Sequence, residues 1–220
     1  MPSTITWDAT GERLFETGVD HGVLYILNPT TGVYGNGIAW NGLTGVTESP
    51  DGAEPTDLWA DNIKYATLRS AETFGLTIEA YTYPDEFGEC DGSASPASGV
   101  YIGQQGRKAF GFCYRTKIGS DTDTEANDYK IHIAYNCTAS PSERSYETIN
   151  DSPDAITFSW EVTTTPVNVT GHKPTSLITI DVSKLDSSKK TALENALYGG
   201  GALPAPDALL ALVGAATTTT

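Results

Sequence analysis

The sequence predicts a mainly β protein with one clear helix and long connecting loops. The chain is rich in turn-forming residues, with 22 Gly and 12 Pro, and several of its segments alternate apolar and polar side chains with period two. Its 220 residues are 39% hydrophobic, which suits a single domain with a substantial core. We divide the chain into an N-terminal arm (1–20), a single β domain (21–200) and a C-terminal segment (201–220).

The first half of the chain contains strands separated by turn-rich segments. A continuous apolar run at 22–27 ends at Asn28-Pro29, which is typical of a buried strand stopped by a turn. Pro50, Gly52 and Pro55 indicate a long, exposed, acidic loop at 49–62. The remaining strands of this half are expected at 38–40, 43–49, 64–70 and 72–83.

The second half alternates more regularly. Apolar residues occupy every second position in 110–115, 129–136 and 156–163, and a further strand is expected at 178–182. This pattern predicts strands with one face on a core and the other face elsewhere. Loops at 120–128 and 138–154 separate these strands.

One segment near the C-terminus has the pattern of a helix. Asp186 or Ser187 can cap its start, Leu193 and Leu197 lie on its apolar stripe, and Gly199 can end it. We expect this helix to pack over the sheet through the two leucines. Short helical turns are also expected at 84–90 and within 203–213.

The chain is acidic. It has 13 Lys and Arg against 28 Asp and Glu, a net charge of −15, and it contains no basic run. Tight binding to nucleic acid requires cations that replace phosphate counterions, so the composition argues against it. The charge serves either solubility alone or the repulsion of DNA.

The three cysteines, Cys90, Cys113 and Cys137, are odd in number and form no CxxC pair. The first residues do not form a signal peptide, so free thiols in a reducing cytosol are expected. No apolar run is long enough to cross a membrane.

The sequence contains no convincing catalytic or metal-binding pattern. His21, His132 and His172 are far apart, and His132 is expected to be solvated or at an interface. The loop 121–125 places oxygen ligands at alternate positions but lacks the glycine and distal Glu of an EF-hand, so a plain acidic loop is favoured over an ion site. Glu143 and Glu147 remain open as a carboxylate pair. We predict no catalytic residue, no metal and no cofactor.

The middle of the chain carries a resemblance to a known family. The pieces are GLTGVTESPDGAEPTDLWADNIKY at 42–65, LRSAETFG at 68–75 and IEAYTYPDEF at 78–87, followed by GQQGR at 103–107 and FGFCYRT at 110–116. They resemble the major tail tube protein of long, non-contractile-tailed (siphovirus-type) bacteriophages. The resemblance covers roughly residues 7–213.

This resemblance implies a β-sandwich or small barrel with a flanking helix and long loops or arms. It implies hexameric rings that stack into a tube in the virion tail, assembled in the cytoplasm of the bacterial host. The partners would be a tape measure protein, a tail terminator and distal tail proteins. DNA would pass through the tube into the host without tight binding. Such a protein is not an enzyme, needs no cofactor and does not insert into membranes.

Two sets of residues follow from this implied role. The loop at 49–62 holds Leu58 and Trp59, which we expect to anchor on a neighbouring ring; the alternative is that the loop folds back on its own core. Six copies would carry about −90, and acids lining the bore would repel phosphates. The candidate lumen acids are Glu48, Asp61, Glu72 and Glu79.

Three other classes of protein stay open. A β-sandwich binding module of the carbohydrate or adhesin type would use Trp and Tyr as sugar platforms. A tail terminator or a capsid accessory protein would also form rings. A hydrolase is the remaining alternative.

Overall fold

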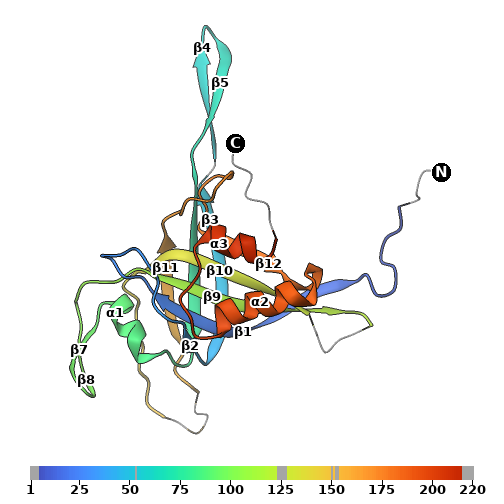
Figure 1. Cartoon of the computed structure of the whole chain (residues 1–220). Helices are drawn as coiled ribbons and strands as arrows, with labels where there is room; N and C mark the ends of the chain where they lie inside the picture. Colours follow the sequence, from blue (N-terminus) through green and yellow to red (C-terminus); the bar gives the residue numbers. More distant parts are fainter. Residues whose placement is uncertain (1–4, 53, 123–127, 150, 152–153, 215–220) are drawn as a thin grey trace.

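The computed structural model describes residues 5–52, 54–122, 128–149, 151 and 154–214, and it confirms the mainly β fold class. Most strands belong to one antiparallel sheet that bends back on itself, and helices cover one of its outer faces (Figure 1). The layers are therefore helix, sheet, core and sheet.

The sheet has eight strands. Its path runs through β2 (Ile38–Trp40), β1 (Leu14–Ile26), β9 (Phe110–Ser120), β10 (Asp128–Ala139), β11 (Phe158–Thr164), β6 (Glu72–Ala80) and β3 (Leu43–Gly52), and β12 (Leu177–Asp181) also pairs with β10. The sheet turns at β10, which pairs with β12 through Lys130–Ala134 and with β11 through Cys137–Ala139. We call β1, β2, β9, β10 and β12 the helix-covered half, and β3, β6 and β11 the arm-bearing half.

The first core lies between the two halves. Leu24, Phe110 and Phe112 of the helix-covered half belong to the same buried cluster as Leu76 and Trp160 of the arm-bearing half. Trp160 is fully buried, and its ring lies 5.5 Å from that of Trp40 and 5.2 Å from that of Phe87 in edge-to-face contact. Such contacts add to the burial energy of large aromatic rings.

A second core lies under the helices α2 (Ser187–Tyr198) and α3 (Pro206–Leu212). Leu193 and Leu197 of α2 pack against Ile131 and Ile133 of β10, so the expected packing of this helix over the sheet is confirmed. The alternating side chains of β9 and β10 point into two different cores, one on each face of these strands. The expectation that only one face of these strands packs on a core is therefore wrong. The helices supply the second apolar environment.

Most of the short helical elements lie where caps and turn residues in the sequence predicted them. The Asp186 carboxylate accepts the Lys189 N–H at 3.0 Å and caps α2, which is followed by Gly199. The expected turns are present as η1 (Asp85–Phe87), α1 (Gly88–Asp91) and α3, while η2 (Val182–Lys184) precedes α2. The expected 91–99 loop instead contributes to a small hairpin, β7 (Ala94–Ala97) with β8 (Val100–Ile102).

The first strand is longer than the sequence indicated. β1 begins at Leu14, which pairs with Ser120 of β9, although the apolar run starts only at residue 22. Gly22 marks a close approach between β1 and the start of β3. A Cβ at this position would lie 2.5 Å from Leu43 Cδ1 and 3.1 Å from the Trp40 carbonyl oxygen, so a larger residue would require the Leu43 side chain to move.

The expected loop at 49–62 is wrong, because most of this segment is a β-hairpin. β3 and β6 stay paired out to Gly52 and Glu72, and β4 (Pro55–Ala60) then pairs with β5 (Ile63–Arg69). Asp61 and Asn62 form the two-residue turn with φ of 50° and 64°, a conformation that Asp and Asn tolerate. We call Pro55–Arg69 the arm; it projects away from the rest of the molecule (Figure 1).

Candidate assembly surfaces

The outward side of the arm-bearing half is a polar sheet face. Core positions such as Leu76, Ile78 and Val162 alternate with small or acidic residues, most of them exposed. Cross-strand register aligns these residues in rows: Gly45, Thr47, Ser49 and Asp51 on β3, Thr73, Gly75, Thr77 and Glu79 on β6, and Ser159, Glu161 and Thr163 on β11. We call these positions the bare face. They include three acids and no Lys or Arg.

The structure does not bring the four predicted lumen acids together. Glu79 lies on the bare face, whereas Glu48 pairs with the core residue Leu76 and points to the other side of the sheet. Asp61 is at the tip of the arm, and Glu72 lies where β6 joins the arm. Sequence reasoning missed Asp51 and Glu161 as members of this face. The alternation around Trp160 was the signal that could have placed Glu161.

Glu48 belongs to a polar cluster at the open end of the first core. Its carboxylate accepts the Tyr114 hydroxyl at 2.5 Å and lies 3.2 Å from His132 Nδ1. The His132 and Tyr114 rings stack at 4.8 Å, and Thr116 Oγ1 lies 3.0 Å from His132 Nε2. The hydrogen bond with His132 lowers the pKa of Glu48, while burial raises the pKa of Tyr114. His132 is buried, so the expectation of a solvated or interface histidine is wrong.

Several strand edges lack partners among the described residues, including those of β3 and of the first part of β1. β3 pairs with β6 along one edge only, and β1 pairs with β2 only through Gly22–Leu24. Unpaired backbone N–H and C=O groups on an edge are able to pair with another chain. These edges are therefore places where a second polypeptide can extend the sheet.

The arm exposes large apolar side chains that no described segment of the chain covers. Trp59 is 67% exposed and Ile63 is 63% exposed, and Leu58, Tyr65 and Leu68 are exposed as well. Alternation along β4 directs Leu58 and Trp59 to opposite faces, so they do not form one contact. The register places Leu58 opposite Ala66 and Ala60 opposite Ile63, which makes one face apolar.

Sequence reasoning missed the apolar residues of β5. The signal was present: Ile63 to Leu68 forms a second strand after Asp61-Asn62, a pair suited to a tight hairpin turn. An isolated two-stranded hairpin is at best marginally stable in water, so the arm is a surface that gains stability from a partner.

Metal-binding side chains are not gathered in the part of the chain that the structure describes. No cluster of three ligating His, Cys, Asp or Glu side chains occurs there. The three cysteines are buried and free, and burial raises the pKa of Cys90 and Cys113 to about 12. Glu143 and Glu147 are exposed in an irregular segment. Residues 123–125 of the considered ion loop lie outside the described residues.

No described helix is long and apolar enough to span a bilayer.

Unpaired strand edges, a polar sheet face and an exposed apolar arm on one β domain are features of a subunit built for assembly. No family model matches this chain, and no curated protein matches it.

Three solved structures are similar to the chain at low identity. One is a chain of the sheath–tube complex of an extracellular contractile injection system, PVC, in the extended state, with 10% identity, 80% of this chain and 94% of that chain covered, and a TM-score of 0.31. Another belongs to the baseplate of the anti-feeding prophage, with 9% identity, 82% of this chain and 100% of that chain covered, and a TM-score of 0.35. A third comes from the PVC sheath/tube terminator in the extended state, with 10% identity, 80% of this chain and 99% of that chain covered, and a TM-score of 0.33. These similarities are too distant to assign a function.

Proposed function

We propose that this chain is the tail tube subunit of a long, non-contractile-tailed bacteriophage. Six copies form a ring, rings stack into a tube, and the tube conducts DNA into the host. The observation that carries the proposal is the bare face: one side of a β half is polar, acidic and free of basic residues, while its other side packs on the core. A tube wall needs such a division between a core side and a bore side.

The strand edges supply the lateral contacts of the ring. β3 ends one side of the sheet, and the Leu14–His21 part of β1 has no strand partner on its second edge among the described residues. Pairing of β3 of one copy with β1 of the next would join the sheets of successive copies into one closed wall. Closure removes the edges that would otherwise invite aggregation.

The bare face lines the bore in this proposal. Asp51, Glu79 and Glu161 would then repeat around the ring, next to Thr, Ser and Gly side chains. Carboxylates repel the phosphates of passing DNA, and small polar side chains leave the bore smooth. The chain acts structurally rather than as an enzyme.

The arm joins successive rings. Its exposed apolar residues, Leu58, Ile63 and Leu68 on one face and Trp59 on the other, would be buried against the neighbouring ring. The tape measure protein would fill the bore during assembly in the host cytoplasm. Terminator and distal tail proteins would close the two ends of the tube.

Negative-stain microscopy of the purified chain tests the proposal. Wild-type protein should form rings and hollow tubes. Trp59→Ala should abolish tubes but leave folded rings or monomers, because a buried aromatic anchor is removed. Trp59→Phe is the matched control and should retain tubes, since it keeps an aromatic side chain.

Three outcomes contradict the proposal. Single particles at high concentration, even with tape and initiator proteins present, would exclude a tube subunit. Single rings without tubes in the wild type would favour a terminator. Tubes of wild-type length from Trp59→Ala would remove the arm's role between rings.

A further inference from the structure

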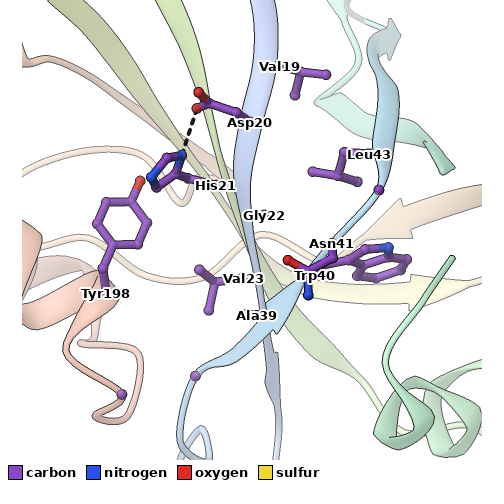
Figure 2. A pocket seen from close by; sticks show the side chains of 13 residues that line it. Val19, Asp20, His21, Gly22, Val23, Ala39, Trp40, Asn41, Leu43 and Tyr198 are labelled. Atoms are coloured by element: carbon purple, nitrogen blue, oxygen red, sulfur yellow. Dashed lines mark ion pairs between the residues drawn. The ribbon is translucent and has the colours of Figure 1, made fainter. Parts of the chain in front are cut away.

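A pocket of about 470 Å³ lies where β1 passes the start of β3. Figure 2 shows Val19 and Leu43 on one side of β1 and Asp20, His21 and Tyr198 on the other. This volume is in the range of sites that bind a ligand or a bulky side chain.

The ionisable side chains of Asp20 and His21 in this pocket are already paired. Arg115 donates to both Asp20 carboxylate oxygens at 2.7 and 3.0 Å, and His21 Nδ1 lies 3.1 Å from Asp20 Oδ1. On one side of β1, the groups left to meet an occupant are the apolar side chains of Val19 and Leu43 and the neutral amide of Asn41 (Figure 2). An apolar occupant therefore fits the pocket better than a charged one.

The backbone around the pocket favours an extended occupant. β1 has no described strand partner on its second edge before Gly22, and β3 has none on the edge opposite β6. A peptide in β conformation can bond to such an edge while its alternate side chains enter pockets.

The N-terminal segment of this chain has the properties of that occupant. Ile5 and Trp7 flank Thr6, so two large apolar residues alternate with a β-branched polar one, which is a strand pattern. Yet the segment forms no strand, and Ile5 and Trp7 are 71% and 78% exposed. It is a strand-forming sequence without a strand partner.

The segment cannot reach the pocket of its own chain. Gly11 N–H donates to Asp121 Oδ1 at 2.9 Å, and Arg13 Nε donates to the Asp8 carbonyl at 3.1 Å. These bonds hold the base of the segment beside Leu14, and the pocket begins about 20 Å farther along β1 at the rise of an extended strand. Trp7 is only one residue beyond Asp8, so this segment is able to fill such a pocket only in a second copy.

We propose that the Ile5–Trp7 segment of one copy docks as an added strand in this pocket of a neighbouring copy, with Trp7 against Val19 and Leu43. The inference rests on the proposed function in requiring neighbouring copies in an assembly. In this proposal the N-terminal segment of each copy binds the neighbouring copy.

A cysteine pair in two separate chains tests this docking. Trp7→Cys and Asn41→Cys proteins are mixed under assembly conditions and oxidised; Asn41 lines the pocket beside Leu43 and is exposed. The three native cysteines are buried, so they should not compete. We expect a disulfide-linked heterodimer on a non-reducing gel. Trp7→Cys mixed with Tyr146→Cys is the matched control and should give none, because Tyr146 is exposed away from the pocket.

A second measurement keeps Trp7 in place. In a Trp59→Phe background, Trp7 is the remaining exposed tryptophan, since Trp40 and Trp160 are buried. Acrylamide quenching of this signal should fall several-fold on assembly. Absence of the heterodimer, or quenching that assembly does not change, overturns the inference even if tubes form. A heterodimer without rings or tubes overturns the proposed function alone.

Discussion

The two halves of the sheet differ in what covers them. In the helix-covered half, β9 and β10 are buried on both faces, by the first core on one side and by α2 and α3 on the other. In the arm-bearing half, β3 and β6 have one core face, and their paired ends continue into an arm that projects from the domain. The comparison teaches that helices bury the second face of one half, whereas the other half leaves its second face largely exposed.

Replacing a buried and an exposed tryptophan of the arm-bearing half, one in its core and one on its arm, has the largest expected effect on stability. Trp160→Ala should lower the free energy of unfolding by about 3–5 kcal/mol, because it empties a fully buried aromatic site. Trp59→Ala on the exposed arm should change it by less than about 0.5 kcal/mol in the unassembled protein. Urea unfolding followed by circular dichroism measures both. Equal losses would mean that the arm is part of the folding unit.

The same comparison explains what the sequence could predict. Strands with a strong period, the cap at Asp186 and the leucine stripe of α2 were predictable, because local patterns determine them. The arm was not recognised as a hairpin, because its strands pack on no core and Pro50, Gly52 and Pro55 suggested a loop. The orientation of Glu48 was also hidden, because it depends on how β3 crosses over β9 and β10.

A variant in the polar cluster around Glu48 should have an intermediate effect on the free energy of unfolding. Tyr114→Phe should destabilise the protein by about 1–3 kcal/mol, because it removes a buried hydrogen bond to a carboxylate. Tyr65→Phe on the arm is the matched control and should be close to neutral. Equilibrium unfolding at neutral pH compares the two variants.

The cluster should also respond to pH through Glu48. Its pKa is lowered in the folded state, so its contribution to stability is present above the ordinary Glu pKa and is lost as pH falls through the lowered value. The wild type should therefore exceed Glu48→Gln in stability near pH 6, and the gap should close toward pH 3. A gap that stays constant over this range would show that the carboxylate charge does not matter.

The smallest effect on stability is expected on the bare face. Glu79→Lys with Glu161→Lys should change the free energy of unfolding by less than about 0.5 kcal/mol, because both side chains are exposed. The effect on function should be large. If these positions line the bore, tubes of the double variant should retain DNA, since lysines replace phosphate counterions, and added salt should release it.

Asp61→Lys is the control that separates the bare face from the arm. It changes the charge at the arm's tip, so DNA retention should stay at the wild-type level if the bore is formed by β3, β6 and β11. Filter binding of assembled tubes to short duplex DNA, measured across salt concentrations, distinguishes the two variants. Retention by Asp61→Lys but not by the double variant would place the arm in the bore and the bare face on the outside, which would reverse the roles inferred for these two surfaces.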